Sequence, residues 1–199
     1  MVATSRRWWS GEAAWGTLVS VTVLPQSRPL TADDLSALPD DGHRYELIDG
    51  TLIVTPAPSW RHQRAVARLL RALMDAADGH LEVLAAPFDV RLADDTVLQP
   101  DVLVCRVSDL TQRNLPAAPL LAVEVLSPST RLVDLNLKRA RYEAAGCPSY
   151  WVVDPEAPAI TAWDLRDGAY VEVASVAGGE RFAAAHPFPI ALAPRDLVD

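Results

Sequence analysis

The sequence predicts a mixed α/β fold in which a mixed central sheet is flanked by helices. Short runs rich in Val and Leu, bounded by Pro, Ser or Gly, are typical of buried strands. Among them lie two longer segments in which apolar residues recur at helical spacing. One long helix before most of the strands and another inserted late in the chain indicate helices packed on a sheet.

Two Asp-Gly dipeptides mark hairpins, because this pair favours the tight turn between antiparallel strands. They are Asp49-Gly50, between the runs 44–48 and 51–54, and Asp167-Gly168, between 160–165 and 170–173. The remaining apolar runs predict strands at about 81–85, 87–92, 100–105, 120–126 and 150–153.

Helix signals occur at three places. A capping-box-like start at Thr31 predicts a short helix to Leu38, and Ser59 can cap a long helix that reaches about Ala77. A third helix is predicted over about 131–145, before Gly146. The apolar stripe of the long helix is Val66, Leu69, Leu70 and Leu73. In the third helix, the residues expected to pack on the sheet are Val133, Leu137, Ala140 and Ala144.

The composition suits one globular domain, since half of the 199 residues are hydrophobic and can form a sizeable core. We expect residues 1–20 to form a flexible N-terminal leader and residues 21–199 to form a single domain. The alternative for the leader is a docking segment that uses Trp8, Trp9 and Trp15.

Composition also limits location and partners. We expect no membrane span, because no run of about eighteen apolar residues occurs. We expect no signal peptide, because Trp8, Trp9, Gly11 and Glu12 interrupt any apolar run near the N-terminus. The two cysteines lack metal-binding spacing, so a reducing cytoplasm is the simplest compartment. A net charge of −8 argues mildly against a protein that coats nucleic acid. It is compatible with a nucleic-acid enzyme, because metal-dependent sites concentrate carboxylates.

Two carboxylates lie beside or within segments that are predicted to be buried strands. Asp101 precedes one apolar run, and Glu124 lies inside another. An ionised carboxylate buried without a cation costs on the order of several kcal/mol. A metal ion, a paired base or a raised pKa removes that cost. Taken singly, Asp101 could cap a neighbouring backbone and Glu124 could pair with a buried arginine.

The ordered motifs around these acids resemble the Uma-type restriction endonuclease family, a branch of the PD-(D/E)XK nuclease superfamily. The resemblance covers roughly residues 28 to 175. Its motifs are Tyr45 to Gly50, Pro58-Ser59 with His62, Gln99 to Asp101, Glu124 to Thr130, Asp134, Lys138, Tyr142, and Tyr150 to Pro155.

This resemblance implies a restriction-endonuclease-like core and a role for each matched residue. Asp101 and Glu124 would bind a divalent cation, Mg²⁺ or Mn²⁺, with Glu46 as an upstream acid. The carbonyl of Val125 would complete the site. The superfamily lysine position is Leu126 here, so Lys138 on the next helix would take that role. Carboxylate ligands agree with a hard cation of this kind.

Other residues near these motifs are open to two interpretations. Arg61, Arg64, Arg68 and Arg71 form a basic stripe that could follow a phosphate backbone, or could be a solvated helix face. His62 could contact a phosphate or lie at the surface. Asp134 could orient Lys138 or form a helical salt bridge with it. Tyr142 is more simply a packing residue.

The expected function is a cytoplasmic, Mg²⁺-dependent endonuclease that hydrolyses phosphodiester bonds in DNA by metal-activated water and acts as a homodimer. The main alternative is a catalytically silent nuclease fold that serves as a nucleic-acid-binding or protein-interaction module. A metal hydrolase for a small phosphorylated substrate is a weaker alternative.

Overall fold

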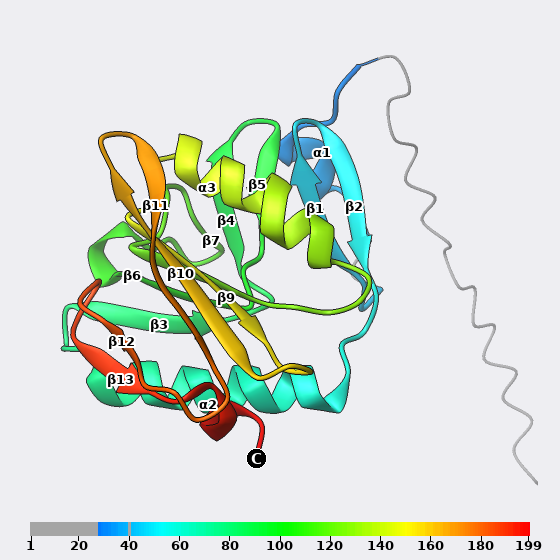
Figure 1. Cartoon of the computed structure of the whole chain (residues 1–199). Coiled ribbons are helices and arrows are strands. Elements are labelled where there is room, and N and C mark those ends of the chain that lie inside the picture. The colour runs from blue at the N-terminus through cyan, green and yellow to red at the C-terminus, as the bar shows by residue number, and fades with distance from the viewer. Residues whose placement is uncertain (1–27, 40) are drawn as a thin grey trace, which may run out of the picture.

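A computed structural model describes residues 28–39 and 41–199 (Figure 1). The predicted leader, residues 1–20, and its three tryptophans lie outside the described residues. Among the described residues, no helix is both long and apolar enough to cross a membrane.

A six-stranded sheet forms the centre of the fold, with its strands in the order β11-β10-β9-β8-β6-β3. β8 and β9 run parallel, whereas the other neighbouring strands run antiparallel. The strands are β3 (Leu81–Ala85), β6 (Val102–Arg106), β8 (Leu121–Val125), β9 (Ser149–Asp154), β10 (Ala159–Arg166) and β11 (Ala169–Ala177).

A second, five-stranded sheet has the order β2-β1-β5-β4-β7. Its strands are β1 (Arg44–Ile48), β2 (Thr51–Thr55), β4 (Asp89–Ala93), β5 (Thr96–Leu98) and β7 (Asn114–Leu115). A third, two-stranded sheet joins β12 (Phe182–Ala184) to β13 (Ile190–Leu192). The remaining short elements are α1 (Ala32–Ser36), η1 (Val107–Asp109) and η3 (Pro194–Leu197).

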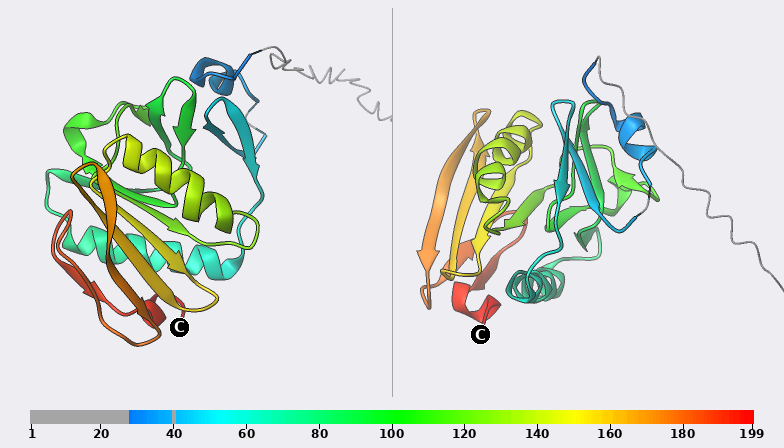
Figure 2. Two further views of the ribbon diagram at one scale, coloured as in Figure 1. Left: turned by 45° about the horizontal axis from the view of Figure 1, so that its top comes forward. Right: turned by 90° about the vertical axis from the view of Figure 1, so that its right-hand side faces the viewer.

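Helices cover both faces of the central sheet, as Figure 2 shows from two sides. The long helix α2 (Trp60–Ala76) packs its buried residues Ala65, Leu69 and Leu73 on one face. On the other face lies a continuous helix made of the π-helical segment η2 (Val133–Lys138) and α3 (Arg139–Ala144). This second face also packs against residues of the five-stranded sheet.

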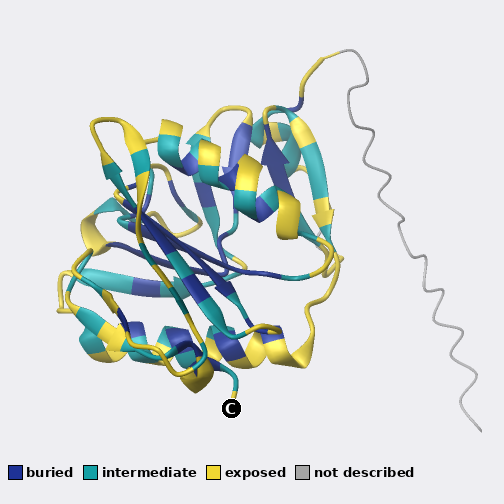
Figure 3. Cartoon of the chain, in the orientation of Figure 1, coloured by how far each residue is buried: buried dark blue, intermediate teal, exposed yellow. Residues whose placement is uncertain are grey.

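The central strands β6, β8 and β9 are buried almost throughout (Figure 3). Because successive strand residues point to opposite faces, β8 sends Val123 and Val125 toward the α2 side. Ala122 and Leu126 belong to the cluster on the η2–α3 side. Glu124, between Val123 and Val125, therefore points toward η2–α3 and the second sheet.

The structure confirms a mixed α/β fold with a mixed central sheet flanked by helices, and it confirms both Asp-Gly hairpins. The sequence did not separate the five-stranded sheet from the central one. It also did not reveal the short strands β5, β7, β12 and β13, because runs of two or three residues are too short to show a period.

The predicted orientation of the third helix is wrong for three of its four named residues, whereas Val133 packs against the cluster on this side of the sheet as predicted. Leu137 is 46% exposed, and Ala140 and Ala144 are also exposed. The buried face instead carries Asp134, Lys138 and Tyr142. Lys138 faces inward because carboxylate partners from two other segments, Glu46 and Glu124, lie there.

We expect Leu69→Ala to lower the free energy of unfolding by about 2–5 kcal/mol, because it opens a cavity between α2 and the sheet. Leu69 is fully buried in that cluster. Met74→Ala on the same helix is the matched control, since Met74 is 54% exposed. Urea denaturation of both variants checks this; equal losses would contradict the placement of the core.

Candidate active site

Four acidic or basic side chains that are far apart in the sequence line one cavity of ≈ 400 Å³: Glu46, Asp101, Glu124 and Lys138. Glu46 comes from β1, Asp101 directly precedes β6, Glu124 lies on β8, and Lys138 ends η2. None of the four is more than 4% exposed. The structure thus brings together all four positions that the resemblance named as catalytic.

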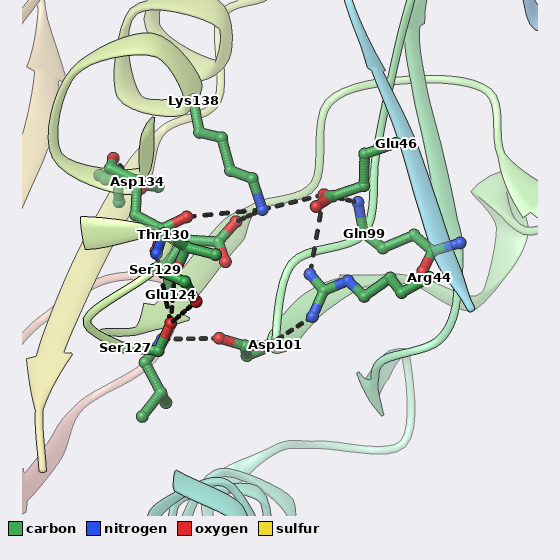
Figure 4. Close-up of polar contacts among 12 residues, drawn as sticks. Arg44, Glu46, Gln99, Asp101, Glu124, Ser127, Ser129, Thr130, Asp134 and Lys138 are labelled. Atoms are coloured by element: carbon green, nitrogen blue, oxygen red, sulfur yellow. Dashed lines mark hydrogen bonds and ion pairs between the residues drawn. The ribbon is translucent and has the colours of Figure 1, made fainter. Parts of the chain in front are cut away.

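The Lys138 ammonium is the common partner of three carboxylates (Figure 4). Its Nζ lies 2.9 Å from Oε1 of Glu46, 3.2 Å from Oε1 of Glu124 and 3.6 Å from Oδ1 of Asp134. An ammonium is a compact charge, which can form ion pairs with three separate carboxylates better than the planar fork of an arginine.

Burial alone would lower the pKa of Lys138, but the charges of Glu124 and Glu46 raise it above its usual range. The side chain is therefore a fixed positive charge at neutral pH. Asp134 forms a helical ion pair with Lys138, which was one of its two interpretations. The same contact holds the ammonium beside Glu46 and Glu124, which agrees with the other.

Asp101 is held by three different donors. Nη1 of Arg44 lies 2.8 Å from its Oδ1. The Val125 backbone N–H donates to its Oδ2 at 2.8 Å, and Nε2 of His62 lies 3.2 Å from the same oxygen. Burial opposes ionisation of this carboxyl group, but the His62 contact and the Arg44 charge outweigh it and lower its pKa to about 2.

Glu46 is fixed by the backbone of the Gln99-Pro100-Asp101 motif. The Gln99 N–H donates to Oε1 of Glu46 at 2.7 Å, and the Gln99 side chain is itself held by Asp89 at 2.8 Å. Arg44 and Glu46 are two residues apart on β1, so both side chains reach the cavity from one face of the strand.

The cluster is more negative than its own cations can balance. Four buried or nearly buried carboxylates, Glu46, Asp101, Glu124 and Asp134, face two permanent cations, Arg44 and Lys138. Burial, together with the neighbouring carboxylates, raises the pKa of Glu124 well above its usual range. Burial likewise raises the pKa of Asp134.

This imbalance and the oxygen donors fit a divalent hard cation, whose two charges equal the formal excess. The arrangement is not a ready-made cage, however. Within residues 28–39 and 41–199, no three acidic, His or Cys side chains are grouped so as to hold an ion. The carboxylates are instead turned toward Lys138 and Arg44. An ion would therefore have to take the place of a protein cation.

His62 belongs to this site, and the alternative of a surface histidine is wrong. The side chain is 7% exposed, and it lies in the first turn of α2, where Ser59 accepts a hydrogen bond from the His62 N–H at 3.3 Å. The helix cap therefore aims the imidazole at Asp101. Contact with nucleic acid stays a prediction for this residue.

The arginine stripe lies elsewhere, since none of its four residues lines the carboxylate cavity. Arg64 donates to the Val198 carbonyl and Arg68 to the Asp196 carbonyl, both at 2.9 Å. Arg61 pairs with Glu156, and Arg71 pairs with Asp75. Two of the four therefore bind the C-terminal segment. A role for the stripe in binding nucleic acid stays a prediction.

Tyr142 is a packing residue, as its position suggested. It is fully buried, and its ring lies 5.5 Å from that of Tyr150. The Tyr150 hydroxyl donates to the Asp134 carbonyl at 2.7 Å and so fixes the π-helical turn that presents Asp134 and Lys138.

Sequence reasoning missed one residue of the site and one signal. The missed residue is Arg44, which stands two positions before Glu46 on a strand and so had to share its face. The missed signal is that Lys138 is the only lysine among 18 basic residues. A chain that otherwise uses arginine places its one lysine where three carboxylates meet.

Comparison with known proteins gives a family match and a structural match. The family profile described as "Uma2: Putative restriction endonuclease" matches residues 32–196. The chain therefore belongs to this family, which confirms the resemblance seen in its motifs. A comparison with curated proteins gives no match.

A solved structure shares the fold. It is described as a "putative nuclease belonging to DUF820" from Anabaena variabilis ATCC 29413. The TM-score is 0.68 at 18% sequence identity, and the match covers 85% of this chain and 98% of that one. At this identity the likeness establishes a common fold.

We expect Lys138→Met to lower the free energy of unfolding by about 3–5 kcal/mol, because three buried carboxylates lose their shared cation. Arg131→Met is the matched control, since Arg131 forms an exposed ion pair with Asp154 at the start of the same helix. Its loss should cost at most about 1 kcal/mol. Urea denaturation in EDTA measures both; losses of similar size would show that the ammonium does not stabilise the cluster.

Proposed function

We propose that this member of the Uma2 family is a divalent-metal-dependent endonuclease that hydrolyses phosphodiester bonds in DNA by metal-activated water. One observation carries the proposal. Three carboxylates and one lysine, delivered by four separate segments, meet in a single cavity that is large enough to admit a phosphate group.

In this proposal Asp101, Glu124 and Glu46 hold Mg²⁺ or Mn²⁺. Val125 supports the same site, since its N–H already binds Asp101. In a strand, the N–H and C=O of one residue point to the same side, so the Val125 carbonyl also faces this region. When bound, the ion supplies Lewis-acid stabilisation of the phosphate and lowers the pKa of water.

The chain's own residues define the rest of the reaction. Lys138 stays protonated because Glu124 and Glu46 raise its pKa. It therefore acts as a hydrogen-bond donor and a positive charge beside the attacked phosphorus rather than as a general base. Asp134 and the π-helical turn hold its Nζ in place.

The cavity wall also suits a phosphodiester. The hydroxyl groups of Ser127, Ser129 and Thr130 line the cavity at the start of the η2–α3 helix. Hydroxyl donors and a helix start are common partners of phosphate oxygens.

We expect the enzyme to act in the cytoplasm. We also expect a homodimer, because two-fold pairs suit the cleavage of two strands.

The catalytically silent module is the competing function. The filled positions argue against it, since a fold that only binds would have no need to bury four carboxylates and the only lysine at one point. A small phosphorylated substrate would require a closed pocket without a path for a polymer.

We expect Asp101→Asn to reduce Mg²⁺-dependent nicking of supercoiled plasmid at least about 100-fold, since it removes a metal ligand. EDTA should abolish nicking by the natural sequence. The control is Asp109→Asn, because Asp109 lies outside the carboxylate cavity and contacts the nearby exposed residues Arg106 and Ser108.

Thermal melts verify that both variants are folded, and calorimetry with Mn²⁺ should show weaker binding for Asp101→Asn alone. Undiminished nicking by Asp101→Asn, or nicking in EDTA, would refute the proposal. Plasmid binding without nicking in either metal would favour the silent module.

A further inference from the structure

Arg44 lies between two of the acids that the proposed function gives to the metal. Its Nη1 is 2.8 Å from Oδ1 of Asp101, and its Nη2 is 3.6 Å from Oε1 of Glu46. Figure 4 shows the guanidinium between these carboxylates. An ion that bridges Asp101 and Glu46 would need the same space.

The two oxygens of Asp101 are not equally available. Oδ2 already accepts from the Val125 N–H and contacts His62. Oδ1 has one partner among the described residues, and that partner is Arg44. A metal ion that approaches Asp101 must therefore take Oδ1, where it would lie beside the guanidinium, and repulsion between the two cations opposes their sharing that oxygen.

Arg44 has room and donors for a second arrangement. The side chain is 19% exposed and lines the carboxylate cavity as well as an adjoining cavity of ≈ 520 Å³. Its buried Nε has no hydrogen-bond partner within the described part of the chain. A guanidinium offers five donors in a fork that matches phosphate oxygens. Arg44 therefore has an N–H donor left for a further hydrogen bond.

We propose that Arg44 holds the metal position closed in the ion-free protein and becomes a phosphate-binding side chain when the ion displaces it from Asp101. The inference rests on the proposed function for its metal and its phosphate. Because the guanidinium places a positive charge at the oxygen that the ion needs, the Arg44–Asp101 pair lowers the apparent affinity for metal. A substrate phosphate that accepts the released guanidinium favours the displaced state, so metal and substrate assist each other's binding.

The test is calorimetric titration of Mn²⁺ into EDTA-treated, dialysed protein without DNA. Arg44→Met should bind Mn²⁺ at least tenfold more tightly than the natural sequence. Arg91→Met is the control, because it removes an equal charge from an exposed pair with Asp94 on the second sheet. It should leave the affinity within twofold.

Arg44→Lys is the second variant, which keeps the buried charge should Arg44→Met fail to fold. It loses the planar fork that reaches Asp101 and Glu46 together, so we expect Mn²⁺ binding at least threefold tighter. Unchanged or weaker affinity in the folded variants overturns the inference, and so does an absence of Mn²⁺ binding in every variant.

The inference and the proposed function fail separately. Tighter Mn²⁺ binding by Arg44→Met, with no nicking by any variant, would support the role of Arg44 and refute the nuclease. Asp101-dependent nicking with no change in metal affinity would support the nuclease and refute the role of Arg44. If both hold, Arg44→Met at saturating Mn²⁺ should still nick at least tenfold more slowly, because the phosphate loses its guanidinium.

Discussion

The contact between the Lys138 ammonium and its three carboxylates joins the two halves of the molecule. Glu124 belongs to the central sheet, Glu46 to the five-stranded sheet, and Lys138 to the helix between them. Buried charges cost several kcal/mol each unless they are paired and hydrogen-bonded, an order-of-magnitude figure. These elements are therefore constrained to one relative placement, since any other would leave a desolvated charge without its partner.

The helix geometry serves the same constraint. η2 is a π-helical turn, a form that is rare and concentrated at functional sites. The Tyr150 hydroxyl from β9 binds its Asp134 carbonyl, so the central strands hold the wide turn in place. The turn directs Asp134 and Lys138 to the interior and leaves Leu137 exposed, which reverses the usual arrangement of an amphipathic helix.

The sequence predicted what depends on local chemistry. Asp-Gly turns located both hairpins, and the stripe on α2 located one face of the core. The division into two sheets could not be predicted, because it depends on strands as short as Thr96–Leu98. The helix face was predicted wrongly because apolar residues were assumed to be inside, whereas the partners that draw Lys138 inward lie on β1 and β8. Arg44 was missed because its partner Asp101 lies 57 residues away in the sequence.

Metal binding and substrate binding are one electrostatic problem in this site. A phosphodiester that approaches the cavity meets a cluster with more carboxylates than cations, in a chain whose net charge is −8. Repulsion between such charges is strong where water is excluded. The arginine stripe of α2 does not line the cavity. A divalent ion cancels this formal excess, and Lys138 and a released Arg44 then face the phosphate as cations. The same acids that repel the substrate from the ion-free site therefore make its binding depend on the metal.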